Sequence, residues 1–131
     1  MPAKSKNIQK SNVLIIEDEQ LLYNLLNQKL QSAGVNVEWA MDGETALEKI
    51  AEHAPDLILL DLLLPGIDGF EVLKRLKQED RFKDIPVIVI SNLGETRDID
   101  SVIKLGAAEY IIKAESSPQE ITEVVLKYCG K

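Results

Sequence analysis

The chain contains few of the residues that build disulfides, zinc sites or membrane spans. It has one cysteine and one histidine among 131 residues, which excludes an internal disulfide and leaves too few ligands for a zinc site. No apolar run approaches the roughly 20 residues that a membrane-spanning helix needs, and the first ten residues lack the apolar core of a secretory signal. We therefore expect a cytoplasmic protein with no membrane segment, in which Cys129 packs rather than reacts.

Positive charge is also scarce, because 15 lysines and arginines stand against 22 aspartates and glutamates, for a net charge of -7. A nucleic-acid surface needs clustered Lys and Arg, so we expect no direct nucleic-acid binding by this domain. An acidic excess usually serves solubility, and it also results when carboxylates gather around a hard cation. We expect one domain over residues 12–129, with a flexible N-terminal tail at 1–11 and a C-terminal tail at 130–131.

Five short apolar runs alternate with five stretches of helical periodicity. The runs predict strands at residues 12–16, 35–40, 57–60, 87–90 and 110–112. The expected inner faces are Ala46, Leu47, Ile50 and Ala51 for the second helix and Ile121, Val124, Val125 and Tyr128 for the fifth. Asp42 is the expected cap of the second helix, Gly106 ends the fourth, and a capping box at Ser117 starts the fifth.

Strands and helices that alternate in this way form a parallel sheet with helices on both faces and right-handed crossovers. The predicted fold is a flavodoxin-like, doubly wound α/β domain, with a five-stranded parallel sheet in the order 2-1-3-4-5 and five helices. Ligands of such sheets bind beyond the carboxyl ends of the strands. Polar residues at that edge are therefore the candidate site.

One stretch, LILLDLLLPGIDG at residues 57–69, places a carboxylate at the end of a buried strand. An ionised carboxylate is costly to bury without partners, so Asp61 is either an ordinary strand-end residue that reaches water or a residue held there for chemistry. Pro65 and Gly66 stop the strand and turn the chain. That turn would let the backbone carbonyl of Leu63 face a metal ion beside Asp61.

Other polar residues follow the neighbouring strands of the predicted sheet. Glu17 and Asp18 come after the first strand, Ser91 ends the fourth, and Lys113 follows the fifth. Each residue has an ordinary explanation when taken alone. Acids are favoured at a helix start, Ser91 can be a strand-end hydroxyl, and Lys113 can be a surface charge. In the predicted strand order, however, all four meet Asp61 at one edge, which favours a functional site.

Neighbouring carboxylates repel unless a cation lies among them, and all-oxygen ligation with water suits Mg²⁺. Asp18 and Asp61 are the best candidates for direct ligands, with Glu17 acting directly or through water and the Leu63 carbonyl as a third oxygen. A carboxylate beside Mg²⁺ and a lysine can accept a phosphoryl group, because the cations offset charge on the transferring oxygens. These residue types therefore favour phosphoryl transfer onto Asp61.

Four motifs in order, IIEDE, DLLLPGIDG, VIVISN and YIIKA, are similar to those of a known family. Over residues 12–128 the chain resembles the receiver domain of two-component response regulators. The resemblance implies that Asp61 accepts a phosphoryl group from a sensor histidine kinase or a phosphotransfer protein. It also implies that Glu17 and Asp18 bind Mg²⁺.

The resemblance further implies how such a domain signals. Ser91 and Lys113 would contact the phosphoryl group, and Tyr110 would follow as the switch aromatic. The surface of the fourth helix, fifth strand and fifth helix would then be read by a downstream effector protein, and a phosphorylation-dependent homodimer is a further expectation. Such a domain catalyses only its own phosphoryl transfer and dephosphorylation, so we do not expect an enzyme with a separate substrate.

Three positions depart from the family pattern, and two rival functions stay open. Ala114 follows the lysine where a cis proline is usual, and a non-proline cis bond costs about 2.5 to 4 kcal/mol. Asn92 replaces a small residue after Ser91, where bulk would restrict access to the phosphoryl group, and Leu64 replaces methionine. The first two favour a pseudo-receiver, a binding module that is not phosphorylated. A Mg²⁺-dependent phosphohydrolase is the other rival, but its usual second acid is replaced here by Leu63.

Overall fold

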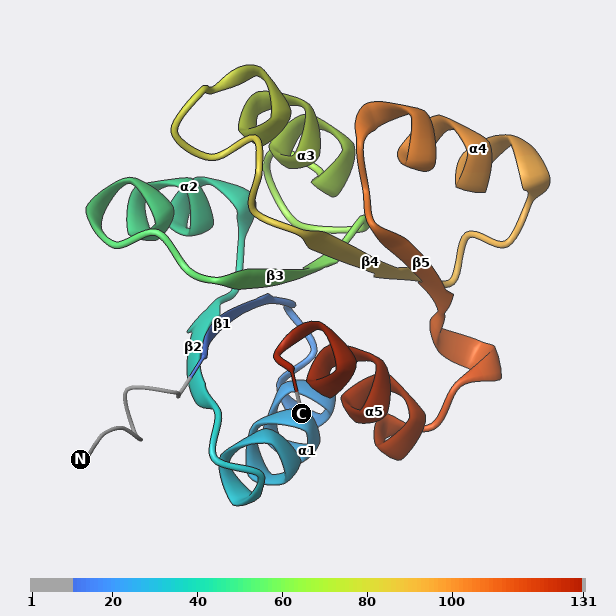
Figure 1. The fold of residues 1–131 in the computed structure, drawn as a ribbon. Helices are drawn as coiled ribbons and strands as arrows, with labels where there is room; N and C mark the ends of the chain where they lie inside the picture. The colour runs from blue at the N-terminus through green and yellow to red at the C-terminus, as the bar shows by residue number, and fades with distance from the viewer. Residues whose placement is uncertain (1–10, 131) are drawn as a thin grey trace.

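The computed structural model describes residues 11–130, so residues 1–10 of the predicted N-terminal tail and Lys131 lie outside the described residues. Strands and helices alternate along the described range (Figure 1). The strands are β1 (Asn12–Ile16), β2 (Asn36–Ala40), β3 (Leu57–Asp61), β4 (Val87–Ser91) and β5 (Glu109–Ile112). The helices are α1 (Gln20–Ser32), α2 (Gly43–Glu52), α3 (Gly69–Gln78), α4 (Thr96–Leu105) and α5 (Pro118–Tyr128), with a 3-10 turn, η2 (Lys113–Glu115), after β5.

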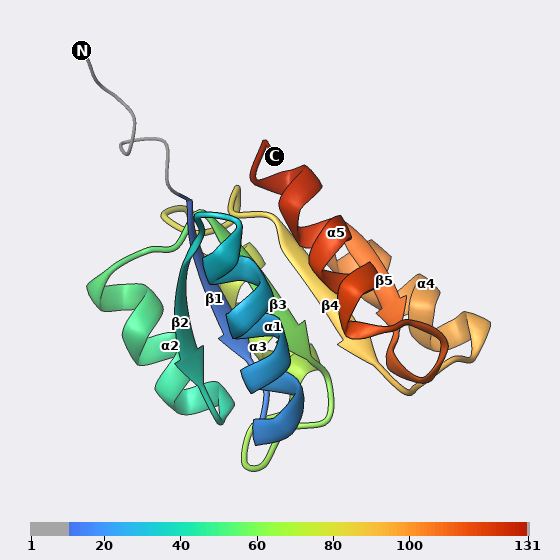
Figure 2. The ribbon, with the colours of Figure 1, turned by 90° about the horizontal axis from the view of Figure 1, so that it is seen from below.

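The five strands form one parallel sheet in the order β2-β1-β3-β4-β5, which confirms the predicted fold. Helices α2, α3 and α4 cover one face, and α1 and α5 cover the other (Figure 1). All five arrows point toward the same edge (Figure 2). The register pairs Ile16 with Leu60 and Asp61 with Ile90, so neighbouring strands end nearly level with one another. No helix in residues 11–130 is long and apolar enough to span a bilayer.

Alternate residues of the strands build two hydrophobic cores, one on each face of the sheet. Leu14 and Ile16 pack with residues of α2, α3 and α4, whereas Val13 and Ile15 pack with residues of α1 and α5. Strands β3 and β4 are buried along their whole length, as expected for strands covered on both faces. Burying each such side chain is worth about 1.5 to 3 kcal/mol, so the two cores hold the strand ends in fixed positions.

The predicted helix boundaries are confirmed by specific backbone contacts. Asp42 Oδ1 accepts a hydrogen bond from the Thr45 N–H at 2.7 Å and so caps α2. Ser117 and Glu120 form the reciprocal capping box at the start of α5, with bonds of 3.1 and 2.8 Å. Gly106 ends α4 in the left-handed conformation at φ +113°, where glycine is favoured. Caps of this kind stabilise a helix by about 1 kcal/mol.

Two of the expected inner-face residues are in fact on the surface. Ala51 of α2 is exposed, and Tyr128 of α5 is 39% exposed, with its hydroxyl donating to Glu109 Oε2 at 2.7 Å. Both lie in the last turn of their helices. Leu21, in the first turn of α1, is likewise 74% exposed. Cys129 packs against the core of the α1 and α5 face, as expected.

Candidate functional site

Asp61 is the last residue of β3, and its side chain is only 4% exposed. The Leu63 N–H donates to Asp61 Oδ1 at 3.1 Å. The chain then turns at Gly66, which has φ +75°, and returns so closely that a Cβ on Gly69 would lie 2.4 Å from the Asp61 carbonyl oxygen. Glycine at these two positions therefore lets the loop after β3 fold tightly against the backbone of Asp61.

Lys113 contacts three carboxylates at this edge of the sheet. Its Nζ lies 2.9 Å from Glu17 Oε1, 2.8 Å from Glu19 Oε2 and 3.0 Å from Asp61 Oδ2. The Lys113 side chain is 9% exposed and that of Glu17 is fully buried, whereas that of Glu19 is 59% exposed. Charged hydrogen bonds are the stronger kind, so this group fixes the lysine ammonium beside the Asp61 carboxylate.

Burial and charge shift the proton affinities of this group in opposite directions. Burial raises the pKa of Glu17 from 4.5 to about 7, although the Glu19 N–H and Lys113 lower it, and the charge of Asp61 adds to the rise. Burial by itself would lower the pKa of Lys113, but its hydrogen bonds to Glu19, Glu17 and Asp61 outweigh burial and raise it. The lysine therefore stays charged at neutral pH, and Glu17 is the acid that resists ionisation.

The carboxylates fit a hard cation. One oxygen from each of Glu17, Glu19 and Asp61 lies within 4.8 Å of the others. Glu17 Oε1 is buried and pairs with the Lys113 ammonium at 2.9 Å. Clustered carboxylate oxygens that outnumber their one ammonium partner form an all-oxygen environment that Mg²⁺ can complete.

One of the direct metal ligands expected from the sequence does not belong to this group of carboxylates. Asp18 is exposed and lies outside the three clustered carboxylates. Glu19, which the sequence analysis did not single out, is at the N-terminal end of α1 and turns its carboxylate toward Lys113. The sequence does mark these acids, as an acidic triplet at residues 17–19. The triplet alone does not show which of its side chains face the site. The role of the Leu63 carbonyl remains a prediction.

The backbone of Glu17 is anchored to β2 on two sides. Its N–H donates to the Ala40 carbonyl at 3.0 Å, and its carbonyl accepts the indole N–H of Trp39 at 2.7 Å. Trp39 also stacks on Tyr23, with ring centroids 4.1 Å apart and planes within 4° of parallel. The only tryptophan of the chain is therefore bonded directly to a residue of the acidic group.

Polar contacts also hold the loop that follows β4. Ser91 is buried at the end of β4, and its Oγ accepts the Leu93 N–H at 3.1 Å. The Tyr110 hydroxyl donates to the Leu93 carbonyl, and burial raises the pKa of Tyr110. Asn92 Oδ1 accepts the N–H of Ala114 at 2.9 Å. Ser91 and Tyr110 thus meet through this loop, at the same edge of the sheet as Asp61.

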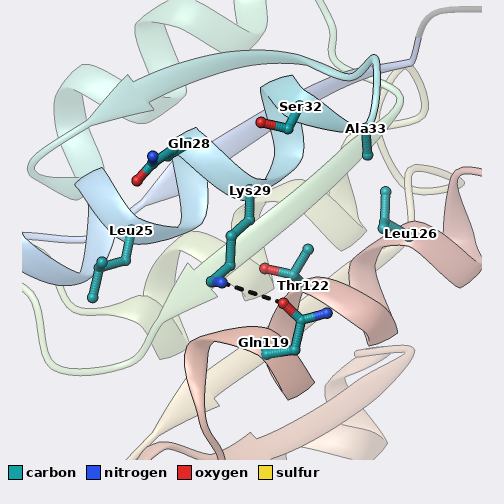
Figure 3. Close-up of a pocket in the computed structure, with 8 residues that line it drawn as sticks. All are labelled: Leu25, Gln28, Lys29, Ser32, Ala33, Gln119, Thr122 and Leu126. Carbon is teal, nitrogen blue, oxygen red and sulfur yellow. Dashed lines mark hydrogen bonds between the residues drawn. The ribbon is translucent and has the colours of Figure 1, made fainter.

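Two surface grooves run beside α1. The larger, of about 500 Å³, is lined by residues of α1 and α5, and Lys29 donates a hydrogen bond across it to Gln119 Oε1 at 3.2 Å (Figure 3). The smaller, of about 330 Å³, has Glu19, Leu21 and Lys113 among its lining residues. The smaller groove therefore gives access to the lysine from the exposed start of α1.

Comparison with known proteins identifies the class of this domain. A sequence model of the response regulator receiver domain matches residues 13–126, so the chain belongs to this family. It is 36% identical over 115 residues to the DNA-binding dual master transcriptional regulator RpaA of Synechocystis sp., covering 88% of this chain and 46% of that protein. It is 32% identical over 112 residues to the phosphate regulon transcriptional regulatory protein PhoB of Rhizobium meliloti, covering 86% and 49% respectively.

Solved structures give the same classification. The receiver domain of a Francisella response regulator has a TM-score of 0.84 and 27% identity, covering 92% of this chain and 98% of that one. The phosphorylated cyanobacterial phytochrome response regulator RcpA has a TM-score of 0.78 and 30% identity, covering 88% and 89%. The chain spans about half the length of RpaA and PhoB. It is a signalling domain of the response regulators of two-component systems, and the pseudo-receiver alternative gains no support.

Proposed function

We propose that this domain accepts a phosphoryl group on Asp61 from a sensor histidine kinase or a phosphotransfer protein. The observation that carries the proposal is the buried Asp61 carboxylate with the Lys113 ammonium 3.0 Å from its Oδ2. The site lies at the carboxyl edge of a parallel sheet, where ligands of such folds bind. Membership of the receiver family supports the same assignment.

In the proposed reaction, a carboxylate oxygen of Asp61 attacks the phosphorus of a phosphohistidine. The new bond joins that oxygen to phosphorus, and the bond from phosphorus to the imidazole nitrogen breaks. The departing imidazole keeps the electron pair and can then take up a proton. Lys113 pairs with an oxygen of the transferring group. Attack of water on the resulting aspartyl phosphate releases inorganic phosphate and restores Asp61, so the domain would catalyse only its own phosphorylation and dephosphorylation.

Bound Mg²⁺ would supply positive charge that offsets repulsion between the carboxylates and the phosphoryl oxygens. We propose that Glu17 and Asp61 hold it together with the Leu63 carbonyl, and that either Asp18 or Glu19 completes the set. The clustered oxygens of Glu17, Glu19 and Asp61 support this assignment.

Phosphorylation is proposed to draw the Ser91 hydroxyl from the Leu93 N–H toward the phosphoryl group. Tyr110, which binds the Leu93 carbonyl, would follow the loop. The surface of α4, β5 and α5 would change for a downstream effector protein or for a second copy in a phosphorylation-dependent homodimer. We place the domain in the cytoplasm and assign any DNA contact of a longer protein to parts outside this acidic domain.

The test is phosphorylation by a small donor. Purified protein is incubated with Mg²⁺ and phosphoramidate, and intact mass and hydroxylamine sensitivity identify an acyl phosphate. One adduct is expected on the wild type and none on Asp61→Asn. The matched control is Asp68→Asn, which changes an acid of the same loop and keeps a capping side chain. Absence of an adduct on the wild type, or its survival in Asp61→Asn, would contradict the proposal.

A further inference from the structure

We propose that Asn92 is a positioning residue for Lys113, acting through the peptide bond that follows the lysine. The Asn92 side chain reaches from the loop after β4 to the turn after β5, where its Oδ1 accepts the Ala114 N–H at 2.9 Å. The bond joins residues 22 positions apart in the sequence. It connects the residue after Ser91 to the residue after Lys113.

The bond requires both of the residues that depart from the family pattern. Proline at position 114 would have no N–H to donate, and a small apolar residue at position 92 would have no acceptor to offer. Asn92 and Ala114 are both exposed, so the hydrogen bond, rather than packing in the core, holds the two residues together. The two departures, which looked independent in the sequence, form one contact in the structure.

This contact bears on the lysine because of where Lys113 lies. β5 is an edge strand that ends at Ile112, so Lys113 is the first residue of η2, outside the sheet ladder. The turn closes on itself through the Ser116 N–H and the Lys113 carbonyl at 3.2 Å. Asn92 ties this turn to the neighbouring loop, and the lysine stem is thereby aimed at Asp61, where its Nζ lies 3.0 Å from Oδ2.

The inference rests on the proposed phosphoryl transfer. It adds a structural link between the two residues that are expected to bind the phosphoryl group. Ser91 and Lys113 are the two side chains expected to bind the phosphoryl oxygens, and the bond between Asn92 and Ala114 holds their backbones in one arrangement. The loop after β4 therefore cannot shift far without either moving the lysine turn or breaking this bond.

The first test uses unphosphorylated protein and three variants. Asn92→Leu keeps a branched side chain of at least the same bulk but removes the acceptor, Asn92→Ala removes both bulk and acceptor, and Asn92→Asp keeps an acceptor. Amide exchange of Ala114, measured by NMR, is expected to be slow in the wild type and Asn92→Asp and about fivefold faster in the other two, the factor of a single neutral hydrogen bond. Acetylation of Lys113 by acetic anhydride, followed by mass spectrometry, is expected to rise by about the same factor in Asn92→Leu and Asn92→Ala.

The second test measures the phosphorylation rate with phosphoramidate and Mg²⁺. Positioning predicts that Asn92→Leu and Asn92→Ala slow phosphorylation alike, by about fivefold. If Asn92 acts only by bulk, Asn92→Ala is phosphorylated faster than the wild type and Asn92→Leu is not, which would overturn the inference. Asn24→Ala, an exposed asparagine of α1, is the matched control, and circular dichroism verifies that each variant is folded.

Failure of the inference can be told apart from failure of the proposed function. If the wild type takes no phosphoryl group, the function is wrong, and the Lys113 acetylation rate still decides whether Asn92 positions the lysine. If the wild type is phosphorylated but Lys113 acetylation is the same in Asn92→Leu and wild type, the positioning role is wrong and the function stands.

Discussion

The loops after β3 and β4 follow neighbouring strands, and each comes after a residue that the proposed reaction uses. The two loops are nevertheless held in place by different kinds of contact. After Asp61, Leu62 is fully buried, and Gly69 approaches the Asp61 backbone too closely for any Cβ. Asp68 then caps α3 by accepting the Glu71 N–H at 3.0 Å. Packing and capping together fix this loop.

After Ser91 the loop is held mainly by polar contacts. Asn92 and Gly94 are exposed, and Glu95, the residue before α4, gives that helix no side-chain cap. A packed backbone cannot shift without a clash or a void, whereas a hydrogen bond can be exchanged for another. The difference indicates that the Asp61 carboxylate is held still while the loop that begins after Ser91 can rearrange.

The largest expected contrast is between alanine substitutions of two loop glycines. Gly69→Ala would place a Cβ 2.4 Å from a backbone oxygen, whereas a Cβ on Gly94 would lie 3.6 Å from Ile112 Cδ1, an ordinary contact. We expect Gly69→Ala to lower the free energy of unfolding by about 3 kcal/mol and Gly94→Ala to change it by no more than about 0.5 kcal/mol. Urea unfolding measures both, and equal losses would remove the distinction between the loops.

A buried acid and an exposed acid should contribute differently to the pH dependence of the free energy of unfolding. Because the pKa of Glu17 is raised from 4.5 to about 7, the folded state binds more protons than the unfolded state across that window. The free energy of unfolding of metal-free protein should therefore fall as pH rises from 4.5 to about 7, by on the order of 2 kcal/mol.

Glu17→Gln should remove most of this pH dependence, and Glu95→Gln, in the exposed loop after β4, should keep it. Unfolding in urea with a chelator present, repeated across the pH range, makes the measurement. An unchanged slope in Glu17→Gln would show that another group is responsible.

A smaller contrast is expected from the acids at two helix starts. Asp68→Ala removes the cap of α3 and should cost about 1 kcal/mol of unfolding free energy. The Glu95 carboxylate pairs with the exposed Arg97 at 3.3 Å and does not cap α4, so Glu95→Ala should change stability by less than about 0.5 kcal/mol. Thermal unfolding of the two variants gives the comparison, and a cost at Glu95 equal to that at Asp68 would contradict it.

The smallest expected effect concerns Tyr110, whose hydroxyl binds the Leu93 carbonyl. Tyr110→Phe removes one hydrogen bond and leaves the ring in place, so a loss of about 0.5 kcal/mol is expected. Amide exchange in the loop after β4 should become faster, while exchange in the loop after β3 should not change. Faster exchange in both loops would mean that they are coupled rather than independent.

The fold could be predicted because its determinants are local. Apolar runs mark the strands, helical periodicity marks the crossovers, and the handedness of those crossovers limits the strand order. The predicted caps at Asp42 and Ser117 depend on side-chain contacts only three residues long, and both are present. The edge at which Asp61 and Lys113 meet follows from the same strand order.

The remaining features depend on distances that sequence patterns do not contain. The first turn of α1 decides that Glu19, rather than Asp18, faces Lys113. Tyr128 is the last residue of α5 and reaches solvent, where its hydroxyl binds Glu109. The contact between Asn92 and Ala114 joins two loops that are separated by a whole helix and strand, so neither residue alone predicts the other.

The position of Trp39 gives this domain a built-in optical probe. Indole emission depends on the hydrogen bond of its N–H and on the rings stacked against it, and here the N–H binds the Glu17 carbonyl while the ring stacks on Tyr23. With a single tryptophan in the chain, the tryptophan emission has one source. The proposed binding of Mg²⁺ can therefore be tested without a label, by a change in emission that Glu17→Gln should weaken.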